Sequence, residues 1–298
     1  MDGFEIKDGV LIKYTGKNDE VTIPNGVTSI GAKAFWECEN LTSIIIPDSV
    51  TKIGYSAFRR CINLQDIIIP NSVTSIEDFA FDGCENLKSI KIPDSVTSIG
   101  IYAFNNCENL TTINLPPRIK NIENNAFRGC INLEKIKIPE GMTEISYSLL
   151  EGCTNLKEVI IPDSVKLIGN SAFAGCESLT KIRLPDDVKD IGAGAFYYCT
   201  QLESVSIPCN VKLLNVDSFG YSKKLKNVSI ANGLKIINFR AFIGCENLET
   251  IIIPSSVTII ENTAFSECKN LKKAIILNKD CSIRPIAFEK GVEVWKRG

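Results

Sequence analysis

Hydrophobic residues recur along this chain with a fixed period of 23 residues. Each repeat has two apolar residues two positions apart, then a proline, a second apolar pair, and finally the pattern Ala-Phe-x-x-Cys. The proline recurs between positions 24 and 254, and the phenylalanine between positions 35 and 288. A fixed period of this length is typical of a solenoid, in which each coil buries its apolar face only against its neighbours.

Each repeat is expected to form three segments. The pattern Leu-x-x-Ile-x-Ile, residues 41–46 in the first repeat, has the alternation of a strand with one buried face. The proline that follows ends the strand, because it has no N–H for a ladder. A second extended segment turns Val50 and Ile53 inward. In residues 57–64 the spacing of three predicts a single helical or 3₁₀ turn, after which the next strand adds in parallel.

The repeat also sets the expected domain organisation. Residues 1–20 do not follow it, and Asp8-Gly9 is a turn pair favoured in hairpins, so we predict an N-terminal cap hairpin. Eleven repeats of 23 residues occupy 21–276. Residues 277–298 are predicted to form a partial repeat and a C-terminal cap, with Trp295 covering the final coil. The result is one continuous body of about twelve coils rather than two globular domains.

One repeat, residues 209–231, departs from the pattern at several positions. Cys209 lies in the turn, Ser218 replaces alanine, Ser222 replaces cysteine and Ala231 replaces proline. These changes indicate either a functional irregularity or drift in a tolerant coil. We favour drift, because the stability of a solenoid is summed over local neighbours.

Ten of the twelve cysteines occupy a single repeat position. They are Cys38, Cys61, Cys84, Cys107, Cys130, Cys153, Cys176, Cys199, Cys245 and Cys268. None forms the C-x-x-C pair of a zinc ribbon, and thiols that all point the same way are poorly placed for disulfides. We therefore predict a buried, reduced structural ladder rather than a disulfide framework or a metal site.

The repeat closely resembles the leucine-rich repeats of the BspA type, through its Leu-x-x-Ile-x-Ile-Pro strand, Ile-Gly bend and Ala-Phe-x-x-Cys turn. The resemblance extends over residues 21–288. It implies a leucine-rich-repeat solenoid of the α/β repeat type, mostly β, forming a right-handed curved horseshoe with a parallel sheet on the concave side. It also implies adhesion or partner binding, commonly at microbial cell surfaces, and it brings no catalytic residues.

Composition excludes several functions. The chain has no histidine, which removes Ser-His-Asp and Cys-His catalysis and zinc sites of the Cys/His type. A net charge of −2 with interspersed signs argues against a general nucleic-acid binder. No apolar stretch is long enough for membrane insertion, and the charged start lacks the core of a secretory signal. The protein is therefore expected either to stay inside the cell or to be a mature portion or excerpt of something longer.

The outward residues of the predicted sheet suggest a binding face. A basic group, Lys91, Lys135, Lys137, Lys181 and Arg183, is interrupted by Glu158. It is either a surface that attracts an acidic partner or a solvated face on which lysine discourages aggregation. The apolar residues on the same face are Ile45, Ile68, Ile160, Ile252 and Ile275. Apolar strips around a basic centre fit a protein partner better than a small ligand.

The sequence thus predicts a non-catalytic module, without cofactor or metal, that binds a protein or an acidic glycan through the concave face. The alternatives are a structural spacer and an intracellular scaffold in a larger assembly. The resemblance places the protein at the cell surface or outside the cell, and the absence of a signal in this chain favours the cytoplasm. A monomer is expected.

Overall fold

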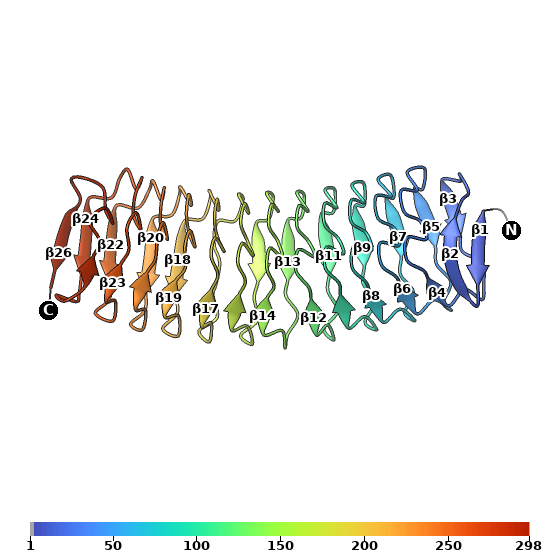
Figure 1. Cartoon of the computed structure of the whole chain (residues 1–298), viewed down its shortest axis with the longest axis horizontal. Coiled ribbons are helices and arrows are strands. Elements are labelled where there is room, and N and C mark those ends of the chain that lie inside the picture. Colours follow the sequence, from blue (N-terminus) through green and yellow to red (C-terminus); the bar gives the residue numbers. More distant parts are fainter. Residues whose placement is uncertain (1–2, 298) are drawn as a thin grey trace. The chain divides into compact units, whose positions relative to one another are not determined.

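The structure is a computed structural model of the chain and describes residues 3–297. It consists of two compact units, Met1–Met142 with Gly152–Thr154 and Thr143–Glu151 with Asn155–Gly298, called here the first and the second unit. Within each unit the chain winds in successive coils whose equivalent strands follow one another in sequence order (Figure 1). The predicted solenoid of parallel strands is confirmed.

One strand of each coil belongs to a row whose outward surface we call the strand face. In the first unit these strands are β3 (Glu20–Thr22), β5 (Ser43–Ile45), β7 (Asp66–Ile68), β9 (Ser89–Lys91), β11 (Thr112–Asn114) and β13 (Lys135–Lys137). In the second unit they are β15 (Glu158–Ile160), β18 (Ser204–Ile207), β20 (Asn227–Ile230), β22 (Thr250–Ile253), β24 (Lys273–Ile276) and β26 (Glu293–Lys296). The pairing keeps the 23-residue period, since Ile44 lies opposite Ile67 and both are buried.

The second extended segment of each coil forms a row of two-residue strands. In the first unit they are β4 (Ser29–Ile30), β6 (Lys52–Ile53), β8 (Ser75–Ile76), β10 (Ser98–Ile99) and β12 (Asn121–Ile122). In the second unit they are β14 (Glu144–Ile145), β16 (Leu167–Ile168), β17 (Asp190–Ile191), β19 (Leu213–Leu214), β21 (Ile236–Ile237), β23 (Ile259–Ile260) and β25 (Ser282–Ile283). Their second residues are mostly buried, as the sequence pattern predicts.

The third segment of each coil, which contains Ala-Phe-x-x-Cys, is not helical. Residues 3–297 contain neither α- nor 3₁₀-helix, so the predicted helical turn is wrong. The N–H of Cys61 donates to the Phe58 carbonyl (3.1 Å), but the N–H of Phe58 donates to Ala80 in the next coil (2.8 Å). Ser56 and Arg60 have left-handed φ angles of 53° and 60°. Because such residues interrupt a right-handed helix, the segment is a run of turns bonded to its neighbour.

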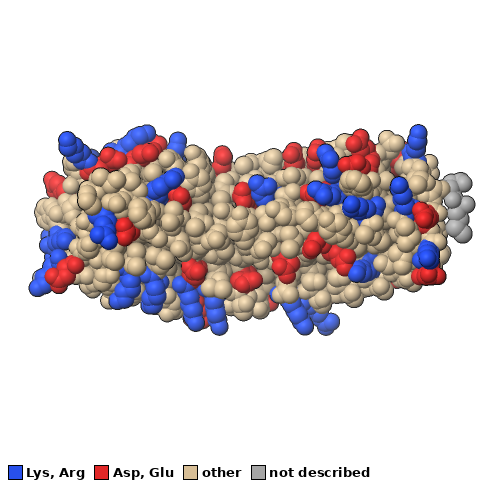
Figure 2. Space-filling model, viewed as in Figure 1, with Lys and Arg blue, Asp and Glu red and all other residues tan. Residues whose placement is uncertain are grey.

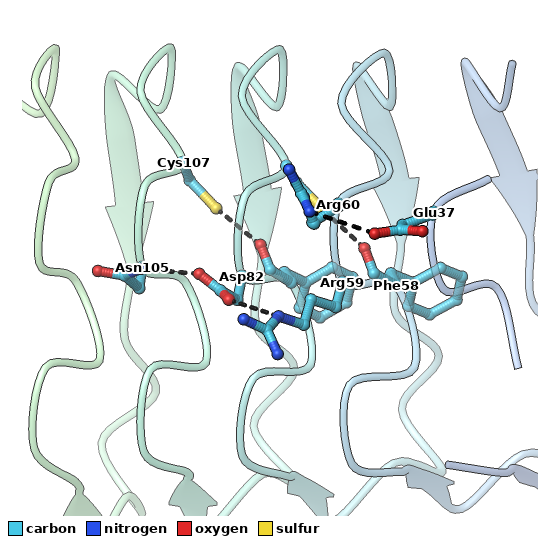
Figure 3. A network of polar contacts seen from close by, with 9 residues as sticks. Glu37, Phe58, Arg59, Arg60, Asp82, Asn105 and Cys107 are labelled. Atoms are coloured by element: carbon cyan, nitrogen blue, oxygen red, sulfur yellow. Dashed lines mark hydrogen bonds and ion pairs between the residues drawn. The ribbon is translucent and has the colours of Figure 1, made fainter. Parts of the chain in front are cut away.

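Polar side chains also connect these turn segments one repeat apart. In the first unit Asp82 accepts a hydrogen bond from the Asn105 amide (2.7 Å) and pairs with Arg59 (2.8 Å), as Figure 3 shows. Arg60 pairs with Glu37 of the preceding coil (3.2 Å). Each of these contacts joins residues of neighbouring coils, so the surface as well as the core holds the coils in register.

The core is built around a stack of phenylalanine rings. In the first unit Phe58 and Phe81 lie 5.2 Å apart with an interplanar angle of 6°, and Phe104 follows at 5.2 Å. In the second unit Phe173 and Phe196 stack in the same way at 5.2 Å. All these rings are fully buried. Offset stacking adds to the large apolar area that each ring removes from water.

The cysteines stand beside this stack and hydrogen-bond to it. The thiol of Cys84 donates to the Phe58 carbonyl (3.1 Å), and that of Cys107 donates to the Phe81 carbonyl (3.3 Å). All twelve cysteines are free thiols, and the ladder members are buried except Cys38, which is half-buried because no cysteine coil precedes it. Ser222 replaces a ladder cysteine and donates to the Phe196 carbonyl in the same way (3.1 Å). A serine hydroxyl can therefore take the place of the thiol at this position.

The N-terminal hairpin continues the first coil. Its strands β1 (Phe4–Lys7) and β2 (Val10–Tyr14) pair antiparallel, and β2 pairs in parallel with β4. The N–H of Tyr14 donates to the Ala34 carbonyl (2.8 Å), and the Tyr14 ring lies 5.3 Å from Phe35. The hairpin thereby covers the end of the aromatic stack.

The C-terminal tryptophan does not lie where the sequence suggested. Strand β26 adds beside β24, with Trp295 opposite Ile275, and Trp295 remains 42% exposed. Trp295 thus lies on the strand face, where the Lys273 Nζ is 3.5 Å from its ring centroid, and it does not cover the final coil. Ile275, which we expected to be exposed, is half-buried.

Removing one ring from the phenylalanine stack is expected to destabilise the fold strongly. Phe81→Ala leaves a cavity between Phe58 and Phe104 and should lower the free energy of unfolding by about 3–5 kcal/mol. Urea denaturation followed by circular dichroism measures this. Phe239→Ala, at an exposed phenylalanine, is the matched control and should change it by less than about 1 kcal/mol. Equal effects of the two substitutions would contradict the packing described.

The buried thiols predict a loss of stability in alkaline solution. Burial raises the pKa of Cys130, Cys199 and Cys268 from 9.0 to about 12. The unfolded chain releases these protons at lower pH than the folded chain. Stability is therefore fully present below about pH 8.5 and falls toward pH 12, by about 1.4 kcal/mol per pH unit for each thiol.

Urea titrations at pH 8 and pH 10 measure this loss. A variant with serine at all three positions keeps a hydroxyl donor, as Ser222 does, and should show a smaller loss between the two pH values. An identical loss in the variant would show that other groups cause it.

Candidate binding surface

The structure places the predicted basic residues on the strand face. Lys91, Lys135 and Lys137 point outward from β9 and β13 of the first unit, and all three are exposed. In the second unit Glu158 points outward from β15. Lys181 and Arg183 lie in the following coil, which joins the row through a single bridge between Lys181 and Ser204.

Part of this positive charge is neutralised by acids that the sequence argument did not include. Lys137 lies 3.5 Å from Glu140, and Arg183 lies 2.7 Å from Asp163. Both acids belong to the turns that follow the strands, so they reach the strand face from its border. Figure 2 shows basic and acidic side chains interspersed on the visible face. The basic group is therefore a weaker attractant for an acidic partner than the sequence suggests.

The apolar residues form a strip in the first unit and part of one in the second. Ile45 and Ile68 lie opposite each other on β5 and β7 and are 63% and 79% exposed. Ile252 on β22 is 54% exposed, whereas its neighbour Ile275 is half-buried beside Trp295. Ile160 is exposed to a smaller extent.

The strand face of the second unit is interrupted between β20 and β22. Strands β18 and β20 form one sheet, and β22, β24 and β26 form another. In other coils the N–H at the start of the strand donates to its equivalent one coil earlier, as from Lys226 to Glu203 (3.0 Å) and from Lys272 to Glu249 (2.9 Å). Within the described chain no such bond joins Glu249 to Lys226. The sheet therefore opens at this point.

A hollow of about 610 Å³ lies at the interruption. It is lined mainly by short polar side chains of β18 and β20 and by residues of β22, namely Ser204, Ser206, Asn227, Ser229, Thr250 and Ile252. Val228 and Ile230 occupy inward positions of β20 but are only half-buried. The hollow thus combines hydroxyl and amide groups with accessible apolar surface, and we call it the β20–β22 hollow.

The irregular repeat 209–231 contributes β20 to this hollow. Its buried replacements keep their hydrogen bonds, since the Ser218 hydroxyl donates to the Asn215 carbonyl (2.6 Å). Ala231 has a backbone N–H at a position where most other repeats have proline. This N–H donates to the Ile207 carbonyl (3.0 Å). Strands β18 and β20 are consequently one residue longer than those of the first unit. Sequence reasoning identified the irregular repeat but missed the hollow, because a missing hydrogen bond leaves no sequence pattern.

Residues 3–297 show no cluster of three or more histidine, cysteine or acidic residues that could hold a metal ion. The same residues contain no helix long and apolar enough to span a membrane.

Comparison with known proteins identifies the family. The model of the BspA type leucine-rich repeat region matches residues 6–133, 99–226 and 189–294. The chain belongs to the BspA-type leucine-rich repeat family. Members of this family are commonly protein-binding or surface proteins and are typically non-catalytic. None of the curated proteins matches the chain.

Several solved structures share the fold of this BspA-type chain. A leucine-rich repeat protein from Bacteroides ovatus is 27% identical, with a TM-score of 0.59, over 99% of this chain and 97% of that one. The leucine-rich repeat protein of T. pallidum is 33% identical, with a TM-score of 0.56, over 59% of this chain and 86% of that one. A leucine-rich cell surface protein from Faecalibacterium prausnitzii is 24% identical, with a TM-score of 0.53, over 99% and 93%.

The interruption predicts fast local hydrogen exchange. Among residues 3–297 the Glu249 N–H has no carbonyl partner, whereas the N–H groups of Lys226 and Lys272 each have one. The Glu249 amide therefore needs a smaller opening motion to reach solvent than the amides of Lys226 and Lys272, and it should exchange fastest of these three amides. Amide exchange followed by NMR measures all three in one sample. Equal protection of Glu249 and Lys272 would contradict an open sheet.

Proposed function

We propose that this BspA-type chain is a non-catalytic module that binds a protein partner through the strand face of its second unit. The observation that supports this most is the β20–β22 hollow, where the sheet opens and inward apolar residues become accessible. Half-exposed Val228 and Ile230 lie next to exposed Ile252, and the serines supply hydrogen-bonding groups. An apolar centre with polar groups around it is the usual composition of a protein interface.

The strand face next to the hollow, on β24 and β26, carries side chains that are often important in interfaces. Trp295 is exposed on β26, and Lys273 and Arg297 lie against its ring at 3.5 Å and 5.6 Å. Lys226 lies 3.9 Å from Glu249 across the interruption. Tryptophan and arginine are enriched among the residues that dominate binding energy. These groups favour a protein partner over an acidic glycan, because the Glu249 carboxylate at the same place would repel the glycan's negative charge.

The absence of histidine and the non-catalytic character typical of the family support a module that binds without catalysis. The frequent surface location of family members supports a position at the cell surface. The proposed partner is therefore a protein that is accessible there, such as a component of an extracellular matrix.

The test is a binding panel of purified extracellular matrix proteins and acidic polysaccharides, measured by surface plasmon resonance on the full chain. Ser206→Phe and Ser229→Phe fill the hollow from its floor, and each should weaken the binding of a protein partner by about tenfold or more. Ser89→Phe, at an outward serine on β9 of the first unit, is the matched control and should leave binding unchanged.

Three outcomes would count against the proposal. Binding that all three variants retain would place the interface away from the hollow. Binding only to acidic polysaccharides, lost at high salt, would favour a glycan partner through the basic group. Absence of binding across the panel would favour a structural spacer or an intracellular scaffold.

A further inference from the structure

A cluster of three tyrosines lies on the turn segments of the second unit, away from its strands. The Tyr198 and Tyr221 rings are nearly parallel, with centroids 5.1 Å apart and an interplanar angle of 21°. Tyr197 is nearly perpendicular to both, at 4.6 Å and 5.7 Å. The two parallel rings therefore pack against Tyr197 in perpendicular contacts and restrict its orientation. Tyr198 is exposed, and the other two are half-buried.

The backbone under this cluster follows the repeat. Tyr198 and Tyr221 have left-handed φ angles of 58° and 56°. The equivalent position in other coils is glycine, as at Gly83, or another residue with the same left-handed φ, as at Arg60 and Glu267. The turn therefore has its usual geometry here, and these two coils differ in the aromatic side chains that they carry.

Tyr197 forms one wall of an open pocket of about 260 Å³. The other walls are Ser171, Ala193, Gly194, Val216 and Asp217. A Cβ at Gly220 would lie only 3.0 Å from the Tyr197 ring, so glycine at 220 allows the ring its position. Arg240 lies 3.0 Å from the Asp217 carboxylate and fixes it beside the pocket. We call this the Tyr197 pocket.

The chemistry of the walls selects the ligand. An aromatic ring and Val216 offer apolar contact to the C–H face of a sugar ring, since the π face of tyrosine carries partial negative charge. The Asp217 carboxylate accepts hydrogen bonds from sugar hydroxyls, and the Ser171 hydroxyl donates or accepts one. At about 260 Å³ the pocket lies below the usual range for drug-sized ligands and suits a single ring.

The charges around the pocket disfavour acidic sugars. Asp217 lines it, and the Glu267 carboxylate lies 3.4 Å from the Tyr221 hydroxyl in the same cluster. The Arg240 cation is already paired with Asp217. We propose that the Tyr197 pocket binds one neutral hexopyranose ring of a glycan. This site is separate from the β20–β22 hollow and does not depend on the function proposed for the strand face.

Saturation-transfer NMR on the full chain tests the proposal. The probes are the methyl pyranosides of glucose, galactose, mannose and N-acetylglucosamine, with methyl glucuronide as the acidic comparison. At least one neutral probe should show saturation transfer to its ring C–H protons, and glucuronide should bind more weakly than glucoside. Absence of transfer to every neutral probe, or stronger binding of the glucuronide, would overturn the proposal.

Four variants locate the site. Tyr197→Ala should lower the affinity for the sugar by about tenfold, whereas Tyr197→Phe, which keeps the ring, should retain most of the affinity. Asp217→Asn should also lower the affinity for the neutral sugar. It should reduce the difference in affinity between the glucoside and the glucuronide. Tyr55→Ala removes an exposed tyrosine of the first unit that packs against Phe79, and it should leave sugar binding unchanged. Equal binding by wild type and Tyr197→Ala, with both chains showing the same circular dichroism, would refute the assignment.

Discussion

The structure depends on contacts between equivalent residues one repeat apart. Phe58 stacks on Phe35 and Phe81, and the paired strands keep the same 23-residue offset. One packing arrangement is therefore repeated, and stability accumulates from neighbour to neighbour. The outward positions of the strands are not bound by this requirement. Lys137, Ser206 and Ile252 occupy the same repeat position, and all are exposed. The fold can thus carry different surfaces on an unchanged core.

Because equivalent residues form the same hydrogen bond in each coil, the effect of a residue that departs from the repeat can be judged by whether that bond is kept. Ser222 replaces cysteine and still donates to a phenylalanine carbonyl, and Ala231 replaces proline and gains a bond to Ile207. These changes are structurally neutral or favourable, in agreement with drift. The missing bond between Glu249 and Lys226 is different, because nothing in the core replaces it. A lost ladder bond weakens the sheet locally, and at the β20–β22 hollow this loss coincides with accessible apolar surface on β20.

Features that recur with the 23-residue period can be predicted from the sequence, whereas features that depend on single side chains cannot. Strand positions and the inward residues follow from alternation. The spacing of Ala-Phe-x-x-Cys fits both a helical turn and a run of turns. The left-handed φ of Ser56 cannot be predicted from the sequence, because only glycine would signal such a conformation. The pairing of Arg183 with Asp163 depends on a turn in the preceding coil. Past Phe288 no repeat sets the register, so the 20-residue offset that places Trp295 beside Ile275 was not foreseeable.

Both proposed sites draw on the same two consecutive coils. Ser206 and Ser229 line the β20–β22 hollow, and Tyr198 and Tyr221 support the Tyr197 pocket; each pair is one repeat apart. In a solenoid a coil contacts only its neighbours, so the loss of a strand bond affects few contacts. The buried residues of these coils, including Phe196 and Phe219, remain stacked at 5.1 Å. The aromatic core is thus intact beneath both proposed sites, so the surface of these two coils can differ from that of the other coils without loss of the stacking that holds the array together.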